Sequence, residues 1–328
     1  MSMLLGGRIC KRLYPLLLCS LSPTLPAAEP AALGSAQQCA EYSGLPAQWS
    51  KDAHAGMVYL TGGGFTLGTN LGYAEERQEV QTQLDGFWID QTEVTVGQFA
   101  TFVKATGYVS EAEREGGGVV FHTPSAAELE QHAYAWWRYQ AGADWRHPDA
   151  GLNPAPDNHP VTLVTLNDAL AYAHWLGRDL PTEVEWEYAA KYANQGKNQE
   201  QEPRDHQGKP LANFWQGRFP QHNNQEDGHA GLAPVGCYPA NPAQLYDMIG
   251  NAWEQTKDIY TAAHQSPPPP IFSGNAIKPA QAMVVKGGSH LCSRDFCVRY
   301  RPSAREAHEA NLPIAHIGFR TVLRERGE

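Results

Sequence analysis

Glycine and proline recur along the whole chain, and their frequency constrains the possible folds more than any other feature. The 31 glycines and 24 prolines make up about one residue in six of the 328, which is more than average usage. Glycine adopts backbone conformations that are closed to other residues, and proline lacks the N–H that helices and sheets need. We therefore predict many turns and loops on a modest framework of helices and strands.

The apolar content is nevertheless high enough for a sizeable core. Hydrophobic residues make up 42% of the chain, which has 9 tryptophans. A chain of this length and composition is globular rather than disordered. No segment repeats at a fixed period, and strand–helix alternation does not continue through the chain, which argues against repeat arrays and dinucleotide-binding folds. We predict one irregular α+β domain.

Local patterns predict where the first regular elements lie. Alternating apolar residues around three glycines predict a strand, a tight turn and a second strand over residues 57–70. Residues 87–90 have the pattern of a further strand. Apolar residues on one helical face over 96–103 then predict a helix, which Gly107 ends.

Two later helices are indicated by the pattern of a Thr followed three residues on by an acidic residue. The pairs are Thr165 with Asp168 and Thr182 with Glu185. Side chains at this spacing accept hydrogen bonds from the free N–H groups of a first helical turn. Between residues 109 and 158 we predict a long irregular stretch, whose tryptophans pack on the core or line a groove.

The first thirty residues have the composition of a secretory signal. Arg8, Lys11 and Arg12 precede an apolar run, and small residues follow near Ala28, which is the order of a cleaved signal. The run of about thirteen residues is too short for a bilayer, so a membrane anchor is the less favoured alternative. We predict three regions: a signal peptide (1–28), a linker (29–52) and one folded domain (53–325).

Charge and hydropathy narrow the classes of partner. The chain carries 35 acidic against 25 basic residues, a formal net charge of -10, and no basic run interleaves with aromatic residues. A nucleic-acid partner is therefore not expected. No later segment approaches the length of a membrane span, so we expect a secreted or periplasmic protein with no membrane contact after signal cleavage.

The cysteine count suits an exported protein. Loss of the signal would remove Cys10 and Cys19 and leave four cysteines: Cys39, Cys237, Cys292 and Cys297. An even number in an oxidising compartment predicts disulfides, and four cysteines allow three pairings. The sequence does not select among these pairings.

Two of the cysteines lie five positions apart in KGGSHLCSRDFCVRYR, residues 286–301. In an exported protein Cys292 and Cys297 can form a disulfide, whereas zinc asks for further paired ligands. Two thiolates without other clustered ligands suit Cu(I), which prefers sulfur and accepts low coordination numbers. Three nearby arginines can lower a thiol pKa or form salt-bridged scaffold: Arg294, Arg299 and Arg301. The disulfide and copper hypotheses both stay open.

A second segment, FPQHNNQEDGHAG over residues 219–231, concentrates Asn, Asp, Glu and Gly. Calcium sites use such oxygen ligands and turn formers. The segment lacks the spacing of an EF-hand. From composition alone a solvated turn is favoured over an ion site.

Eight stretches in chain order carry a family resemblance: GGGFTLGTN, FWIDQTEVTVGQFATFVKATGYVSEAE, ADWRHP, DNHPVTLVTLNDALAYAHWLGRDLPTEVEWEYAA, ANFWQGRFP, LYDMIGNAWEQTKD, KGGSHLCSRDFCVRYRPSAR and IGFR. From about Met57 to Val322 the chain is similar to the formylglycine-generating enzyme, the sulfatase-modifying factor. The resemblance implies a single irregular domain related to C-type lectins and low in regular secondary structure. It also implies an oxidase that converts a cysteine in a Cys-x-Pro-x-Arg segment of an unfolded sulfatase to formylglycine, using O₂, Cu(I) and a thiol reductant.

The resemblance gives roles to particular residues. Cys292 and Cys297 would bind copper, and the substrate thiol would join as a third ligand before O₂ is activated. Ser289 and Trp253 would line the reaction pocket. Structural Ca²⁺ would occupy two sites, the first held by Asn213, the Phe214 carbonyl, Asp227 and the His229 carbonyl, and the second by Asp247, the carbonyls of Gly250 and Ala252, and Glu254.

The chain departs from the family pattern at several positions. His316 stands where relatives commonly have an asparagine near the active site, and Asp247 replaces an asparagine while keeping an oxygen ligand. Pro302 and Thr321 replace cysteines that form disulfides in lumenal members. Two alternatives therefore stay open: a diverged enzyme that oxidises another substrate, and a non-catalytic, calcium-stabilised, lectin-like binding module.

Overall fold

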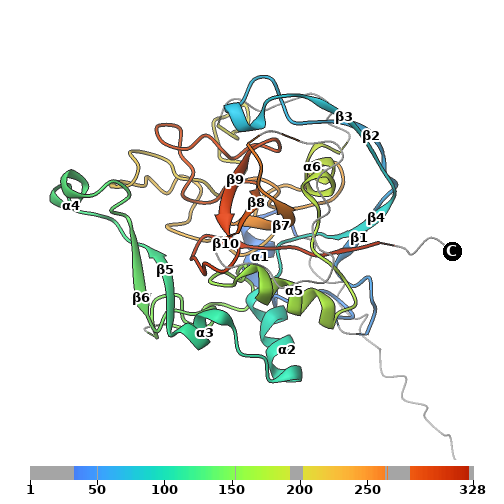
Figure 1. Cartoon of the computed structure of the whole chain (residues 1–328), viewed down its shortest axis with the longest axis horizontal. Coiled ribbons are helices and arrows are strands. Elements are labelled where there is room, and N and C mark those ends of the chain that lie inside the picture. The colour runs from blue at the N-terminus through green and yellow to red at the C-terminus, as the bar shows by residue number, and fades with distance from the viewer. Residues whose placement is uncertain are drawn as a thin grey trace, which may run out of the picture. The chain divides into compact units, whose positions relative to one another are not determined.

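The computed structural model describes residues 33–49, 51–151, 153–192, 202–262, 264 and 281–324. The expected signal peptide lies outside these ranges. In chain order the elements (Figure 1) are α1 (Ala36–Glu41), β1 (Met57–Leu60), β2 (Gly63–Leu67), the 3₁₀ helix η1 (Ala74–Glu76), β3 (Val80–Leu84), β4 (Phe87–Asp90), α2 (Val96–Thr106), α3 (Glu111–Glu115), β5 (Gly117–Phe121), α4 (Ala126–Gln131), β6 (Trp137–Ala141), α5 (Leu166–Trp175), α6 (Glu183–Lys191), β7 (Trp253–Ile259), β8 (Ala282–Lys286), β9 (Arg305–Glu309), β10 (Ile317–Gly318) and β11 (Val322–Leu323).

The α+β prediction and the expected low content of regular structure are confirmed. The span Ala31–Glu328 is one compact unit, and its described residues between 202 and 252 include neither a helix nor a strand. Among the residues that the structure describes, none of the helices is long and apolar enough to cross a membrane.

The predicted helix starts are confirmed by their hydrogen bonds. Helix α5 begins at a reciprocal cap in which Thr165 accepts from the Asp168 N–H and the Asp168 side chain accepts from the Thr165 N–H. Thr182 and Glu185 begin α6 in the same way. Helix α2 ends at Gly107, whose φ of 69° is a left-handed conformation that favours glycine.

The described strands form several small sheets of two to four strands each. Strand β4 is central in the order β1-β4-β11, and a second sheet has the order β10-β7-β8-β9. The two strands expected over residues 57–70 both form, but β1 pairs with β4 and β2 pairs with β3. Figure 1 shows β7, β8 and β9 side by side. The loop that joins β8 to β9 contains both active-site candidates, Cys292 and Cys297.

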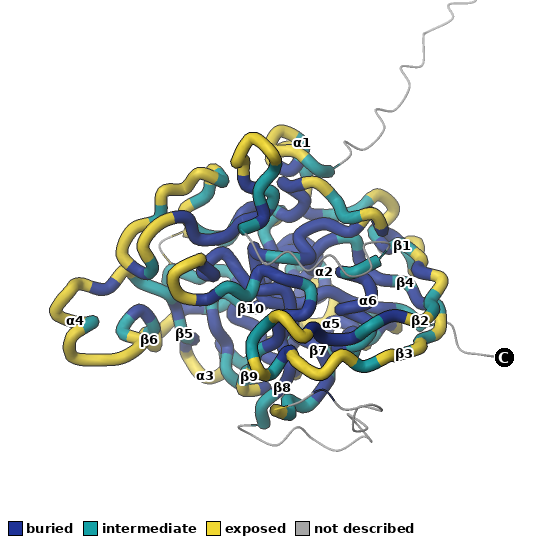
Figure 2. The backbone as a smooth tube through the Cα atoms, turned by 90° about the horizontal axis from the view of Figure 1, so that it is seen from above, coloured by how far each residue is buried: buried dark blue, intermediate teal, exposed yellow. Residues whose placement is uncertain are grey.

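The stretch between residues 109 and 158 is more regular than predicted. Gly117–Phe121 (β5) pairs antiparallel with Trp137–Ala141 (β6), and α4 lies between them. None of the residues of α4 is buried, and Figure 2 shows it as an exposed turn at the far end of the hairpin. Strand pairing across fifteen intervening positions is a tertiary contact, which the local sequence pattern did not indicate.

Two apolar clusters support the region around the cysteine loop. Phe99 of α2 packs between Tyr172 of α5 and Trp145, with ring centroids 5.9 and 5.0 Å away. Trp186 of α6 and Phe87 of β4 belong to the second cluster. Trp145 therefore packs on the core, which is one of the two positions predicted for the tryptophans between residues 109 and 158.

The expected linker over 29–52 contains folded structure from residue 33 onward. Helix α1 lies within it, and Cys39 at its fourth position forms a disulfide with Cys237. The Gly34 N–H also donates to the Gly236 carbonyl at 2.8 Å. The described part of this segment is thus attached to the domain rather than free.

Candidate active site

A double glycine makes the cysteine loop possible. Gly287 and Gly288 follow β8 with φ of 95° and 77°, left-handed conformations that residues with a side chain rarely adopt. A Cβ on Gly288 would also lie 2.6 Å from the Arg299 carbonyl oxygen. These glycines allow the chain to turn sharply and to pass against the far end of its own loop.

The two thiols of this loop lie in direct contact. The Sγ atoms of Cys292 and Cys297 are 3.1 Å apart, both residues are buried, and neither is in a disulfide. A turn holds each cysteine, because the Cys292 N–H donates to the Ser289 carbonyl and the Cys297 N–H donates to the Ser293 carbonyl. The structure therefore contains a preformed pair of free thiols rather than a closed disulfide.

The environment distinguishes the two thiols electrostatically. Burial raises the pKa of Cys292 well above its usual value, whereas the hydrogen bond from Cys292 lowers the pKa of Cys297. Arg299 adds to the lowering at Cys297. The other two arginines of the motif serve elsewhere, since Arg301 pairs with the buried Glu76 at 2.5 Å and Arg294 is exposed. If one thiol ionises, Cys297 is the one favoured as thiolate.

The structure brings the predicted Ser289 and Trp253 to the thiols. Trp253 shares a buried apolar cluster with Cys292 and Cys297. Ser289 is buried, and its N–H points at the Cys292 sulfur at 3.5 Å. The predicted catalytic residues therefore form one site, although they come from β7 and from the loop after β8.

His316 lies at the same site. Its Nδ1 is 3.1 Å from the Ser289 hydroxyl oxygen, and its carbonyl accepts from the Trp253 N–H at 2.9 Å. Its imidazole ring lies against Trp137 of β6, with 4.6 Å between centroids. His316, the residue that departs from the family pattern, is thus within hydrogen-bond distance of Ser289.

A cluster of aromatic rings connects the cysteine loop to the surface. Phe296, directly before Cys297, is 48% exposed and stacks on Phe219 with ring centroids 4.6 Å apart. Trp136 lies edge-on to both rings at 5.1 Å. We call these three residues the aromatic cluster. Trp136 belongs to the stretch whose tryptophans were expected to pack on the core or line a groove, whereas the sequence did not single out Phe219. The available signal for Phe296 was its position between the two cysteines.

The second expected calcium site contains buried acidic side chains. Asp247 and Glu254 are both buried, and both oxygens of Glu254 are bonded by Arg320. Burial and the charge of Glu254 raise the pKa of Asp247 to about 6. The left-handed backbone of Asp247 and Gly250, with φ of 52° and 77°, shapes the tight loop that holds the expected carbonyl ligands.

Glu93 joins this site, and sequence reasoning missed it. Its side chain is fully buried, and one of its two oxygens has no hydrogen-bond partner. Burial, together with the charges of Asp247 and Glu254, raises its pKa well above the usual value. Three buried carboxylates thus face one guanidinium, that of Arg320, and a divalent cation would fit both the charge and the free oxygen.

The residues of the first expected calcium site also lie together. The Asp227 carboxylate accepts from the Phe214 N–H at 3.2 Å and from the His229 N–H at 3.0 Å. The side-chain amide of Gln216 donates to both Asp227 and the Phe214 carbonyl. Asn213 lies next to this loop, since its side chain donates to the Gly231 carbonyl at 2.9 Å. Hydrogen bonds from Gln216 here satisfy two oxygens that a cation would otherwise hold.

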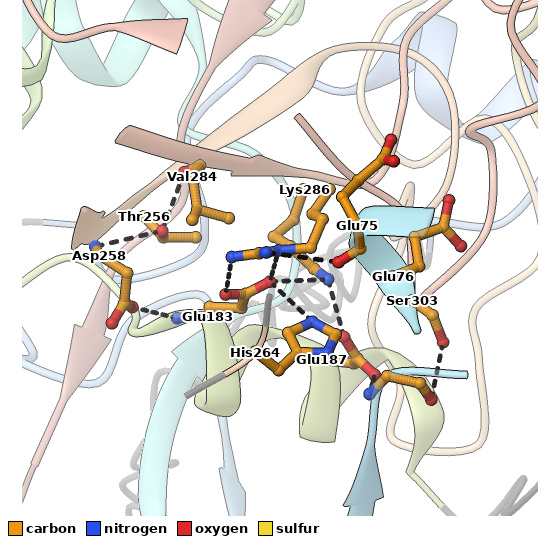
Figure 3. A network of polar contacts seen from close by, with 12 residues as sticks. Glu75, Glu76, Glu183, Glu187, Thr256, Asp258, His264, Val284, Lys286 and Ser303 are labelled. Carbon is orange, nitrogen blue, oxygen red and sulfur yellow. Dashed lines mark hydrogen bonds and ion pairs between the residues drawn. The ribbon is translucent and has the colours of Figure 1, made fainter. Parts of the chain in front are cut away.

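Another buried cluster has the residue types of a metal site, but basic side chains already balance the negative charge of its carboxylates. Glu183, Glu187 and His264 offer ligand atoms within 4.8 Å of one another. Figure 3 shows Lys286 between the two carboxylates, with its Nζ 2.8 Å from Glu187 and 3.6 Å from Glu183. Arg305 also binds Glu183 at 2.7 Å. Lys191 contacts Glu187 as well, at 2.6 Å. With three cations already on its two carboxylates, the cluster is best explained as a buried ion-pair network.

Comparison with known proteins adds to this geometry. Residues 42–325 match the model of the sulfatase-modifying factor enzyme 1-like domain. The chain is 39% identical over 290 residues to the formylglycine-generating enzyme of Mycobacterium tuberculosis, covering 81% of this chain and 97% of that protein. It is also 38% identical to the mouse protein named inactive C-alpha-formylglycine-generating enzyme 2, over 80% and 84% of the two chains.

The fold has a further counterpart among solved structures. PvdO from Pseudomonas aeruginosa superimposes with a TM-score of 0.58 at 20% identity, over 91% of this chain and 100% of that one. Because similar identity connects this chain to relatives named as active and as inactive, sequence similarity alone does not decide activity.

Proposed function

Because this chain belongs to the sulfatase-modifying factor family, we propose that it is a formylglycine-generating oxidase that acts on a cysteine of a sulfatase. One observation carries the proposal: Cys292 and Cys297 are free, buried and 3.1 Å apart beside Ser289 and Trp253. A binding module stabilised by calcium would have no use for such a preformed thiol pair. The alternative of a non-catalytic module is therefore less well supported.

The donor set fits Cu(I). Cys292 and Cys297 would hold the ion with two sulfur atoms, which is the ligand type that Cu(I) selects. The surrounding cluster is apolar and includes Trp253, Tyr300 and Ile317. Bound Cu(I) would supply redox chemistry with O₂ and an open position for the substrate sulfur.

The overall reaction fixes which co-reactants are needed. Conversion of a cysteine CH₂SH group to an aldehyde with release of H₂S takes up one oxygen atom. The second atom of O₂ leaves as water, which needs two protons and two electrons. A thiol reductant would supply these electrons, so the proposed partners are an unfolded sulfatase, O₂ and such a reductant.

The aromatic cluster supports a peptide substrate. Phe296, Phe219 and Trp136 offer ring faces and edges from the surface to the cysteine loop. Aromatic surfaces bind extended, proline-containing segments well because such segments lose little entropy on binding. A Cys-x-Pro-x-Arg segment could place its cysteine at the thiol pair while its proline packs on Phe296.

We also propose two structural Ca²⁺ ions. The second site would use Asp247, Glu254 and the carbonyls of Gly250 and Ala252, and we add Glu93 because of its unpaired buried oxygen. The first site would use the residues around Asp227. There the Gln216 amide would have to give up its bond to the Phe214 carbonyl when the ion binds.

Export is part of the same proposal. The Cys39–Cys237 disulfide suits an oxidising compartment, which agrees with the signal expected over residues 1–28. We propose a secreted or periplasmic location, where an exported sulfatase would arrive unfolded.

The test is direct conversion of a peptide. Purified mature protein is incubated with Cu(I), O₂, a thiol reductant and a Cys-x-Pro-x-Arg peptide, and the peptide is followed by mass and by aldehyde reactivity. Conversion is expected for the wild type and should be lost in Cys292→Ser and Cys297→Ser. Ser125→Ala, which changes an exposed helix cap, serves as the matched control. An unchanged peptide in the presence of copper-loaded wild-type protein would refute the proposal.

A further inference from the structure

His316 is held in place from three directions. Its Nδ1 contacts the Ser289 hydroxyl at 3.1 Å, its ring packs against Trp137, and its carbonyl accepts from the Trp253 N–H. As a whole residue, His316 is nevertheless intermediate between buried and exposed. One ring nitrogen therefore faces the catalytic serine while part of the residue remains open to solvent.

Ser289 connects this imidazole to the thiols. Its N–H points at the Cys292 sulfur at 3.5 Å, and its carbonyl accepts from the Cys292 N–H. Its hydroxyl oxygen accepts from the Leu291 N–H at 3.3 Å. With that acceptor position used, the hydroxyl proton is free to point at His316, and a second lone pair remains for an incoming group.

The surroundings keep the imidazole neutral. Burial lowers the pKa of His316 well below its usual value, and the nearby His290 and His308 add to this effect. These two histidines are the titratable groups that act on it, and burial lowers the pKa of each to about 4. A neutral imidazole whose Nδ1 accepts a hydrogen bond carries its proton on Nε2.

Building on the proposed function, we propose that Ser289 and His316 form a proton relay for the substrate thiol. The thiol proton passes to the Ser289 oxygen as the serine hydroxyl proton passes to Nδ1 of His316. The proton on Nε2 then leaves to solvent, and the substrate sulfur remains as a thiolate. No electrons move, and the net change is one proton released.

A weak base suffices for this step. A thiol that joins a metal ion becomes strongly acidic, so the acceptor needs only to be neutral, correctly placed and able to pass the proton on. His316 meets these conditions. An asparagine at this position would offer a hydrogen bond but take up no proton near neutral pH. The relay is therefore specific to the histidine.

The test separates substrate binding from turnover. Cu(I)-loaded protein is mixed with the cysteine peptide without O₂, and the rate of thiolate formation at the metal is followed by absorbance between pH 5.5 and 9. The variants are His316→Asn, Ser289→Ala and the double variant. His206→Asn is the control, because it removes a histidine at an exposed position.

We expect a nearly pH-independent rate in the wild type and in the His206 control. In His316→Asn the rate at pH 7 should fall about 100-fold, as loss of general acid–base catalysis does. It should then rise about tenfold per pH unit towards the thiol pKa of about 8.5, because only preformed thiolate reacts. The double variant should be no slower than either single variant.

The result that would overturn the relay differs from the result that would overturn the proposed function. An unchanged pH profile in His316→Asn, whether or not the rate falls, would overturn the relay and leave the proposed function standing. Failure of the wild type to bind Cu(I) would instead overturn the proposed function and this inference with it. If His316→Asn does not fold, His316→Gln provides the same measurement with a longer amide.

Discussion

Cys39 and Cys237 are joined by a disulfide although 198 positions separate them in the sequence. The bond attaches α1 to the loop whose Gly236 N–H donates to the Asp247 carboxylate at 2.5 Å. The N-terminal segment therefore braces the loop that supports the acidic cluster of Glu93, Asp247 and Glu254. This connection was not among the features that the sequence revealed.

Removal of the disulfide should weaken both the fold and calcium binding. In Cys39→Ser/Cys237→Ser we expect a loss of about 2–5 kcal/mol in the free energy of unfolding, together with a weaker Tm increase on addition of Ca²⁺. Chemical denaturation and calcium titration would measure both. Cys292→Ser/Cys297→Ser is the control and should retain the full calcium response. An unchanged stability in the first variant would contradict the bracing role.

The acidic cluster should make stability depend on pH when calcium is absent. A carboxyl whose pKa is raised in the folded state loses stability as pH rises from its unfolded value of about 3.9 through about 6. In chelator, Asp247→Asn should therefore be more stable than wild type at pH 7, by on the order of 1–3 kcal/mol. The difference should vanish near pH 4.

Comparison of two proteins at each pH is essential to this test. Buried histidines such as His290 have a lowered pKa, and they reduce stability as pH falls, which masks the trend in wild type alone. With saturating Ca²⁺ the order should reverse, because the variant has lost a ligand. Asp85→Asn, at an exposed position, should show neither effect. A variant that is less stable than wild type in chelator at pH 7 would refute the argument.

Loss of Lys286 should be costly. Its ammonium is fully buried between Glu187 and Glu183. Lys286→Met would remove one partner from this buried network and leave Lys191 and Arg305 as the remaining cations, at a cost of about 3–5 kcal/mol. Arg114→Met removes the pair between exposed Arg114 and partly exposed Glu111 and should cost less than about 1 kcal/mol. Equal losses in thermal denaturation would argue against the ion-pair network shown in Figure 3.

Phe296 should affect peptide binding more than chemistry. Phe296→Ala removes the exposed ring that stacks on Phe219, and we expect KM for the peptide to rise about tenfold, equivalent to about 1.4 kcal/mol, with kcat little changed. Tyr59→Ala, another exposed aromatic residue, is the control. A fall in kcat at constant KM would show that the ring does not serve as a docking surface.

The two thiols should react at different rates in metal-free protein. Cys297 has the lowered pKa, and Cys292 has the raised one, so alkylation followed by peptide mapping should label Cys297 first. Arg299→Met should slow this labelling because it removes a positive charge beside the sulfur. Preferential labelling of Cys292 would contradict the assignment.

The sequence by itself determined those features that short-range interactions set. The helix starts at Thr165 and Thr182 were predictable because each cap is completed within three residues. The spacing of Cys292 and Cys297 limited their chemistry to a few possibilities, and the motifs around them indicated the family. High glycine and proline content correctly predicted an irregular fold.

Only the tertiary structure decided the features that depend on residues far apart in the chain. It paired Cys39 with Cys237, brought Glu93 beside Asp247, joined β5 to β6, and placed His316 against Ser289. No local pattern encodes such contacts, because each depends on how several segments pack at once. The 3.1 Å between the sulfur atoms of Cys292 and Cys297 depends on the conformation of the loop between β8 and β9, whose two ends are held by the pairing of those strands.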